Sequence, residues 1–266
     1  MAAPTPATGH ARVLAVANQK GGVGKTTTAV NTAACLAEAG QRVLLIDCDP
    51  QANATSGLGM SPSGDDTARR LTLYDVIVDR SPIGDAIVAT DVPGLDLVPG
   101  DRDLAGATYD LQSADDRDVR LREAIAAVVH RYAFIFIDCP PSLGLLTINA
   151  LAAADAVVVP VQAEYYALEG LTQLLETIEL VQRHLNPRLE VAGMLLTMVD
   201  GRTRLAGEVA EEVRRAFGDL AYRTIVPRSV RLAEAPSHGT PITRYDARSA
   251  GAEAYFSFAE EVAARG

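Results

Sequence analysis

Short apolar runs alternate with amphipathic segments along most of this chain. The runs have the length of strands and lie at 12–18, 43–47, 95–98, 133–138, 156–161 and 191–198. The segments between and after them have helical composition and lie at 27–39, 118–131, 143–153, 167–185, 203–217 and 251–264. Near-continuous apolar strands that alternate with helices are typical of a mostly parallel sheet buried on both faces. We therefore expect an α/β fold with a single doubly wound, mostly parallel sheet and helices on both of its faces.

Length and composition favour one domain. The chain has 266 residues, 48% of them hydrophobic, which suffices for one large core. We expect residues 1–11, rich in Ala, Pro and Thr, to form a disordered tail and residues 12–266 to form the domain. The most polar internal stretch, 61–68, is expected to be a surface loop. No apolar run reaches the roughly 18 residues of a transmembrane helix, and the start lacks the pattern of a secretory signal.

The cysteines and the net charge further limit the classes of function that the chain can have. Cys35, Cys48 and Cys139 show no Cys-x-x-Cys spacing, which favours a reduced cytosol and no thiolate metal site. We expect all three to be buried as small hydrophobic residues. The formal charge of −10 argues against extensive coating of nucleic acid but leaves room for a local basic patch.

Both lysines of the chain lie in one short stretch, Lys20 to Thr27, and elsewhere the strongly basic residue is always arginine. Lysine is a compact point charge and arginine a planar fork, so the two do not replace one another in a tight loop. The stretch reads Lys-Gly-Gly-Val-Gly-Lys-Thr-Thr and follows an apolar run of strand length. This is the pattern of a phosphate-binding loop, in which a glycine-rich turn leads from a strand into a helix.

The loop pattern assigns roles to its residues. Lys25 is expected to reach the β- and γ-phosphates, and the Thr26 hydroxyl is expected to bind Mg²⁺ directly. The following helix, opened by Thr26 or Thr27, adds unpaired N–H groups and the positive end of its dipole. The leading glycine of the usual pattern is absent, and Lys20 takes an extra, early place. The alternative is a glycine-rich turn that only joins a strand to a helix. The predicted nucleotide-binding residues of this stretch are Lys20, Gly21, Gly22, Val23, Gly24, Lys25, Thr26 and Thr27.

Two of the predicted strands end in aspartate. Asp47 closes the run at 43–47 and precedes Asp49, and Asp138 closes the run at 133–138. Ligands of a parallel sheet bind beyond the carboxyl ends of its strands, so these acids are expected on the same edge as the loop. Asp138 resembles a Walker B acid that holds Mg²⁺ through water. Asp49 is better placed than Asp47 to orient an attacking water, although a strand-end aspartate often only caps a turn or a helix.

The early lysine of the loop, Lys20, indicates a resemblance to a known family. The stretch at 20–27 resembles the deviant Walker A motif of the ParA/MinD ATPases. Further stretches are similar to the chromosomal ParA proteins, also called Soj, which are partition ATPases. These are Asp-Cys-Asp-Pro-Gln-Ala-Asn at 47–53, Asp-Cys-Pro-Pro-Ser-Leu-Gly at 138–144, Pro-Val-Gln-Ala-Glu-Tyr-Tyr at 160–166 and Val-Pro-Arg-Ser-Val-Arg at 226–231. The similarity implies a P-loop NTPase-like fold and a ParA-type ATPase domain over 12–266.

The resemblance implies an ATP hydrolase of weak intrinsic activity that works as an ATP-dependent sandwich dimer. Lys25 would bind phosphate in its own subunit, and Lys20 would reach the nucleotide of the partner, where it stabilises charge on the transferring phosphoryl group. Asp49 would position the attacking water, and both Asp49 and Asp138 would lie near Mg²⁺ through water. The adenine site would include Pro227 and Ser229, although family members often have asparagine in place of Ser229. The catalytic residues implied are Lys20, Lys25, Asp49 and Asp138.

The resemblance also implies DNA and a second protein as partners. Arginines that match Arg202 and Arg231 bind nonspecific double-stranded DNA in the dimers of the family, and Arg204 is a plausible local addition. The lack of interleaved aromatic residues favours phosphate contact without sequence readout. Arginines on helix faces are commonly only solvated, and we assign that role to Arg214 and Arg215. The second partner is a ParB/Spo0J-type centromere-binding protein that stimulates hydrolysis and releases DNA, which places the protein on the nucleoid in the cytoplasm.

Three other functions stay open in the sequence. A MinD-like membrane-associated division-site ATPase shares the loop but needs a basic amphipathic helix at its end, and here the last aromatic residues are flanked by glutamate. An iron protein of the nitrogenase type needs cluster cysteines, for which Cys139 is the one candidate and lacks a partner. A small-molecule ATP-dependent ligase of similar fold needs a substrate pocket, which the sequence does not identify.

Overall fold

The strands of the described structure form one sheet. The computed structural model describes residues 11–61, 70–164 and 169–265. The strand order is β3-β4-β2-β5-β1-β6-β7-β8, and all neighbouring pairs are parallel except β3 with β4. The strands are β1 (Arg12–Val16), β2 (Val43–Asp47), β3 (Val88–Ala89), β4 (Leu95–Val98), β5 (Phe134–Asp138), β6 (Ala156–Gln162), β7 (Glu190–Val199) and β8 (Ala221–Pro227).

Helices connect the strands and cover the sheet. The longer helices are α1 (Lys25–Glu38), α6 (Arg120–Ala126), α7 (Leu145–Ala153), α8 (Glu169–His184), α9 (Arg204–Phe217) and α12 (Ala250–Ala264). The shorter helices are α2 (Asn53–Gly57), α3 (Leu73–Ile77), α4 (Ile83–Ala86), α5 (Ala107–Asp110), α10 (Val230–Glu234) and α11 (Ile242–Tyr245). Short 3-10 turns are η1 (Arg102–Ala105), η2 (Val129–Arg131), η3 (Gly218–Leu220) and η4 (Ala235–His238).

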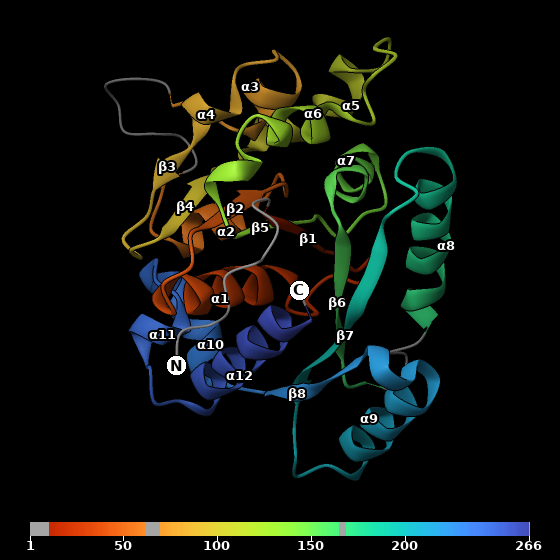
Figure 1. Cartoon of the computed structure of the whole chain (residues 1–266). Helices are drawn as coiled ribbons and strands as arrows, with labels where there is room; N and C mark the ends of the chain where they lie inside the picture. The colour runs from red at the N-terminus through yellow and green to blue at the C-terminus, as the bar shows by residue number, and fades with distance from the viewer. Residues whose placement is uncertain (1–10, 62–69, 165–168, 266) are drawn as a thin grey trace.

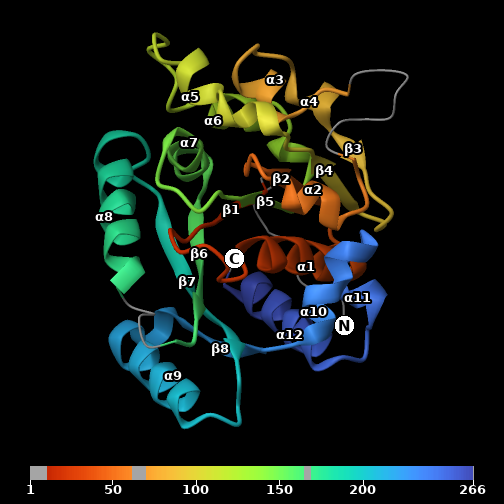
Figure 2. The ribbon, with the colours of Figure 1, turned by 180° about the vertical axis from the view of Figure 1, so that it is seen from behind.

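Alternate residues of the central strand β1 face two separate cores. Val13 and Ala15 pack into a core shared with α6, α7, α8 and α9. Leu14 and Val16 pack into a second core shared with α1 and α12. Figures 1 and 2 show α1 and α12 side by side on one face of the sheet, with α7 and α8 on the other. The predicted fold, a doubly wound and mostly parallel sheet covered on both faces, is therefore confirmed.

Several element ends differ from the sequence prediction. The first strand stops at Val16 rather than residue 18, because the Asn18 side chain is used to hold the following loop. α1 begins at Lys25, before the predicted start at Thr27, because Gly24 already stands at its N-cap in a left-handed conformation. The predicted helix at 118–131 is divided into α6 and η2.

The hydrophobic pattern does not predict β8 or β3. The middle of β8 carries Arg223 and Thr224, so the strand is not a continuous apolar run. Its place comes from pairing with β7 along the edge of the sheet. β3 has two residues and pairs antiparallel with β4, which is too short a segment for a period to show.

Four further expectations concern the cysteines, membrane-spanning helices, the N-terminal tail and the loop at 61–68. Cys35, Cys48 and Cys139 are free and buried, as predicted. Among the described helices, none has both the length and the apolar character needed to cross a membrane. The predicted tail lies outside the described residues except for Ala11, which is buried, and most of the predicted loop at 61–68 also lies outside them.

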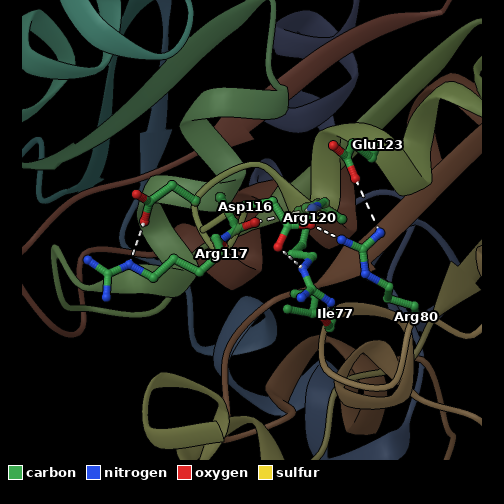
Figure 3. A network of polar contacts seen from close by, with 9 residues as sticks. Ile77, Arg80, Asp116, Arg117, Arg120 and Glu123 are labelled. Carbon is green, nitrogen blue, oxygen red and sulfur yellow. Dashed lines mark hydrogen bonds and ion pairs between the residues drawn. The ribbon is translucent and has the colours of Figure 1, made fainter. Parts of the chain in front are cut away.

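Ion pairs hold the turn after α3 against α6 (Figure 3). Arg80 pairs with Asp116, and its Nη1 lies 3.6 Å from a carboxylate oxygen of Glu123 in α6. Arg120 lies 3.0 Å from Asp116 and donates from Nη1 to the Ile77 carbonyl at 3.3 Å. Arg80 itself has a φ of 58°, which is unusual for a residue other than glycine. The pairs therefore stabilise a turn whose backbone is locally strained.

Candidate functional site

The glycine-rich loop lies between the end of β1 and the start of α1, at the carboxyl edge of the sheet. Gly22 and Gly24 have φ values of 74° and 87°, in the left-handed region that favours glycine. Asn18 anchors the loop, because its Nδ2 donates to the Pro160 carbonyl at 2.7 Å and its Oδ1 accepts from the Lys20 N–H at 3.0 Å. The first turn of α1 therefore points its unpaired N–H groups at the loop, which suits an anion.

Lys25 is a cation held in a place with little water. The residue is 7% exposed, and its Nζ donates to the Lys20 carbonyl at 3.2 Å. Burial lowers the pKa of Lys25, while the negative charges of Asp138 and Asp49 oppose that shift. An anion bound at the loop would favour the charged form of Lys25 and offset the cost of its burial.

Asp138 is the residue whose surroundings point most directly to a ligand. It is fully buried at the end of β5, and neither of its carboxylate oxygens has a hydrogen-bond partner among the described residues. Burial raises the pKa of Asp138, the charge of Asp47 raises it further, and the nearby Thr26 hydroxyl lowers it. An unpaired buried carboxylate is costly, and a hydrated divalent cation would supply both the missing charge and the missing donors.

The oxygen donors at this edge suit Mg²⁺. This cation usually keeps several waters and takes only one or two protein ligands together with the phosphates of a substrate. Thr26, Asp49 and Asp138 offer one hydroxyl and two carboxylates. The described residues hold no group of three or more His, Cys, Asp or Glu that would make a metal cage from protein alone. The donor set therefore fits a cation that is shared with a bound phosphate.

The two aspartates that follow Ile46 have different surroundings. Asp47 is fully buried and accepts hydrogen bonds from the Thr55 N–H at 2.8 Å and the Thr55 hydroxyl at 2.6 Å. Burial raises the pKa of Asp47 to about 6, and the bonds from Thr55 oppose that shift. Asp49 is 6% exposed and accepts from the Gln51 N–H at 2.9 Å. Asp47 therefore holds α2 in place, and the role of Asp49 toward water stays a prediction.

A cavity of about 520 Å³ opens beside the loop. Its walls include Thr27 at the start of α1, Pro227 at the end of β8 and Ser229 just before α10. Thr197 of β7 also lines it, and the Thr197 hydroxyl donates to the Val23 carbonyl of the loop at 2.8 Å. The volume lies within the range of small-molecule sites. The structure thus brings both predicted adenine residues next to the predicted phosphate site.

Comparison with known proteins places the chain in a family. A family model described as an AAA domain matches residues 11–191. The sporulation initiation inhibitor protein Soj of Bacillus subtilis is 57% identical over 255 residues, which cover 96% of this chain and 99% of that protein. The chromosome partitioning protein ParA of Caulobacter vibrioides is 54% identical over 256 residues, which cover 96% of this chain and 94% of that protein. The chain belongs to the ParA/Soj family of chromosome-partitioning ATPases. It is an ATP hydrolase.

A solved structure shows what this fold can hold. The cobyrinic acid a,c-diamide synthase of Mycobacterium smegmatis superimposes with a TM-score of 0.81 and 39% sequence identity, covering 94% of this chain and 92% of that one. That protein has ADP and magnesium bound. A nucleotide with magnesium is therefore compatible with the architecture that this ParA/Soj family member shares with it.

The early lysine of this ParA/Soj family member is held by an acid that the sequence pattern does not single out. Lys20 Nζ lies 3.0 Å from Glu164 Oε2, and Gln162 Nε2 donates to Glu164 Oε1 at 2.6 Å. The Lys20 and Glu164 side chains are 37% and 51% exposed. Ion pairs this exposed typically contribute about 0–1 kcal/mol, so Lys20 can exchange Glu164 for a stronger anion. Glu164 lies beside Lys20 because β6, which precedes Glu164, pairs with β1 in the sheet, and the sequence alone does not show this pairing.

The arginines predicted to bind DNA lie beyond the ends of β7 and β8, outside the phosphate loop. Arg202 follows β7, and its Nε and Nη2 donate to the two carboxylate oxygens of Asp200 at 2.9 and 2.8 Å. Arg231 lies in α10, which follows β8, and pairs with Glu234 at 3.0 Å. Because β7 and β8 are neighbours in the sheet, the two arginines belong to segments that leave the same edge. Each is paired with a carboxylate in this member of the ParA/Soj family.

Arg204 is the most exposed of the three predicted DNA-binding arginines. It is the first residue of α9, its side chain is 93% exposed, and it pairs with Glu208 at 2.8 Å. Arg202 is 89% exposed and Arg231 57%. Exposed pairs of this kind are weak, so these arginines can contact an external phosphate.

β7 contributes to the cavity beside the loop in a way that the sequence pattern does not predict. Met198 lines the cavity next to Thr197 and has a φ of 54°, a left-handed conformation that is strained for methionine. Strained backbone of this kind tends to occur at functional sites. The apolar run at 191–198 predicts only a buried strand, and only the sheet order places its end beside the loop.

Proposed function

We propose that the loop at 20–27, Asp49 and Asp138 bind ATP with Mg²⁺ and carry out its hydrolysis. The observation that carries this proposal is the fully buried and unpaired Asp138 carboxylate near the Lys25 ammonium. Lys25 would hold the β- and γ-phosphates. Thr26 would hold Mg²⁺ directly and Asp49 and Asp138 through water, and the bound cation would supply positive charge beside the phosphates. Asp49 orients the water that attacks the γ-phosphorus; the bond from phosphorus to the ADP oxygen breaks, and the displaced proton of the water leaves with the phosphate product.

The adenine is proposed to occupy the cavity beside the loop. Pro227 offers an apolar wall, and Ser229 offers its backbone and hydroxyl, so the base is held by packing and a few polar groups. Thr27 joins this cavity to the start of α1, where the phosphates bind. The distance between the base and the phosphates is thus set by the short connection from the loop into α1.

The active form is proposed to be a homodimer assembled on ATP. Lys20 lies at the outer side of the loop with part of its side chain in solvent, which supports a role toward the nucleotide of the partner subunit. In that role its ammonium stabilises charge on the γ-phosphoryl group in the transition state. Lys20 must then leave Glu164, so assembly of the dimer and release of this ion pair are one event. Intrinsic hydrolysis by the single chain is expected to be weak.

DNA binding is proposed to depend on the dimer. Arg202, Arg204 and Arg231 bind the phosphates of nonspecific double-stranded DNA, since phosphate contacts carry no sequence information by themselves. The chain has a net charge of −10, so one small patch is too weak and two copies on one duplex are required. A ParB-type centromere-binding protein is the proposed stimulator of hydrolysis, which releases the DNA. The protein would then act on the nucleoid in the cytoplasm.

A MinD-like membrane role is less well supported. The last described helix, α12, buries Tyr255, Phe258 and Val262 in the core shared with α1, and of its aromatic residues Phe256 is exposed, at 38%. A helix that binds a membrane interface needs such residues on its outer face. Sedimentation with anionic liposomes and ATP tests this alternative directly, and only cosedimentation would support it.

The proposed role of Lys20 predicts different effects at the two ends of its ion pair. Lys20→Ala should leave ATP binding by the monomer intact but prevent dimerisation and hydrolysis. Glu164→Gln keeps the lysine and removes the competing carboxylate, so ATP-driven dimerisation should strengthen by up to about fivefold. Light scattering with ATP and a phosphate-release assay measure both effects. Normal dimerisation and hydrolysis by Lys20→Ala would show that the lysine does not act on the partner.

The proposed DNA patch predicts that Arg202→Glu together with Arg231→Glu abolishes DNA binding. Each phosphate neutralised contributes about 0.9 to the log–log salt slope, so the slope should flatten as well. ATP-driven dimerisation and basal hydrolysis should survive, because neither arginine lines the phosphate site. Gel shifts of duplex DNA at fixed salt measure the loss, with Arg215→Glu, an exposed arginine of α9, as control. If the double variant shifts DNA like the unmodified chain, the arginines are only a solvated face.

A further inference from the structure

A second cavity, of about 870 Å³, lies at the amino edge of the sheet. It is formed by the starts of β1, β7 and β8, the η3 turn and the last parts of α9 and α12. The phosphate loop and the adenine cavity lie at the opposite edge of these strands. The two cavities are therefore separate sites at opposite ends of β7 and β8. The volume of the second cavity is large enough for a small organic molecule.

The cavity has an excess of positive charge. Its charged lining residues are the acids Glu190 and Asp219 and the arginines Arg12, Arg214, Arg223 and Arg265. Arg12 donates from Nη1 to the Val262 carbonyl at 3.1 Å, and Arg265 donates from Nη1 to the Ala192 carbonyl at 2.9 Å. A guanidinium has five donors, and a carbonyl orients it without neutralising its charge. Both half-buried arginines therefore keep charge and donors available.

Four arginines stand against three carboxylates at or beside the cavity, Glu190, Asp219 and Glu261. Arg223 lies 3.8 Å from Glu261. Within the described ranges of the chain, no ion pair involves Arg12, Arg214 or Arg265. In a chain with ten more acidic than basic residues, unpaired arginines that meet at one cavity are an informative exception.

A buried hydroxyl gives an independent sign of a ligand. Tyr222 lines the cavity and is 1% exposed, and its hydroxyl has no hydrogen-bond partner among the described residues. A buried hydroxyl without a partner is destabilising, so native structures normally satisfy it. Burial raises the pKa of Tyr222 to about 12, while Arg265 and Arg12 oppose that shift. The hydroxyl is therefore a proton donor at neutral pH and lies close to two cations.

The wall of the cavity is held in a fixed geometry. The Arg265 guanidinium lies 4.0 Å from the centre of the Tyr222 ring, a stacking arrangement that orients both groups. Gly193 has a φ of 149°, and a Cβ there would come within 2.8 Å of the Tyr222 ring and 2.9 Å of Arg265 Nη1. Only glycine allows the ring and the guanidinium to pack against the backbone of β7 in this way.

We propose that this cavity binds a small phosphate-bearing molecule, with a phosphoryl group held by the arginine guanidinium groups and by the Tyr222 hydroxyl. Guanidinium forks match the oxygens of a phosphoryl group in pairs, and several of them at one place favour a multiply charged anion over a single carboxylate. The ligand would join β1, β7, β8 and the end of α12. This site does not depend on the proposed roles of Arg202, Arg231 or Lys20.

Calorimetry with inorganic pyrophosphate tests the proposal. The full chain carries Lys25→Ala, so that pyrophosphate does not enter the phosphate loop, and chloride keeps the ionic strength fixed. We expect saturable binding of one pyrophosphate per chain. Adding Arg214→Glu and Arg223→Glu, both exposed positions, should weaken it at least about tenfold. The matched control, Arg183→Glu with Arg215→Glu, makes the same charge change outside the cavity and should alter affinity less than about twofold.

A conservative variant separates ligand binding from folding. Tyr222→Phe removes a hydroxyl that has no hydrogen-bond partner in the described part of the chain, so the melting temperature without pyrophosphate should not fall. The affinity for pyrophosphate should fall by about tenfold, because a hydrogen bond to a charged group is lost. The absence of saturable binding, or binding that the Arg214→Glu and Arg223→Glu pair leaves unchanged, would overturn the proposal. The proposal would also be overturned if pyrophosphate did not bind and the arginine variants changed only the ATP-dependent binding of duplex DNA.

Discussion

Replacement of Lys25 by alanine should abolish measurable ATP binding. The ammonium is 7% exposed and faces the phosphate site, so its loss leaves the β- and γ-phosphates without a partner in a place with little water. Truncating one partner of a buried charge pair costs about 2–5 kcal/mol, which is at least about thirtyfold in affinity. Calorimetry with ATP and Mg²⁺ measures the effect. Near-normal affinity would exclude Lys25 as the main phosphate ligand.

Lys25→Arg tests whether positive charge alone is enough at this position or whether the shape of the lysine side chain is also needed. Arginine keeps the positive charge but is larger and planar, and α1 begins at this residue. We expect this variant to bind ATP poorly as well. Both variants should remain folded, because burial of the Lys25 charge is itself unfavourable and its removal does not break a packed core. A melting curve checks this before the calorimetry is interpreted.

Asp49→Ala should allow the ATP-bound dimer to form and slow hydrolysis by about 10²-fold or more, the size of a general acid–base contribution. The phosphate ligands stay in place, and only the carboxylate that orients the attacking water is lost. Single-turnover phosphate release measures the rate, and size-exclusion chromatography with ATP measures the dimer. Monomer alone in the presence of ATP would mean that Asp49 is needed for the cation or for the loop.

Asp49→Asn separates the carboxylate from the local fold. The asparagine side chain can still accept from the Gln51 N–H, as Asp49 does at 2.9 Å, so the turn is kept. Its amide carries no negative charge to hold and polarise the attacking water, so hydrolysis should remain much slower than in the unmodified chain. Asp47 does not offer such a test, because its carboxylate holds both the N–H and the hydroxyl of Thr55.

The sequence predicts the parts of the site that depend on neighbours along the chain. The loop at 20–27 and the acids at the ends of β2 and β5 follow local rules, since a strand, a turn and a helix start within a few residues. The parallel sheet then requires these ends to share an edge, and the structure confirms that the ends of β2 and β5 are neighbours. The roles of Asp49 and Asp138 at that edge stay predictions.

The parts that escape the sequence depend on order within the sheet. Glu164 meets Lys20 because β6 lies beside β1, and no spacing in the chain shows this. Met198 reaches the cavity proposed to hold adenine because β7 continues the same edge. The cavity at the amino edge joins Arg12 with Arg265, from opposite ends of the chain. Long-range neighbours of this kind have no periodic signal along the chain.

β7 and β8 each end in a wall of the adenine cavity, Met198 and Pro227, and each continues within a few residues to an arginine proposed to hold DNA. Binding of ATP and of DNA would then be linked equilibria. Whatever factor ATP adds to the affinity for DNA, DNA must add to the affinity for ATP, and a tenfold factor corresponds to about 1.4 kcal/mol. Molecules on the nucleoid would retain their nucleotide longer than free ones, without any further sensor. Hydrolysis would be the step that ends this mutual retention.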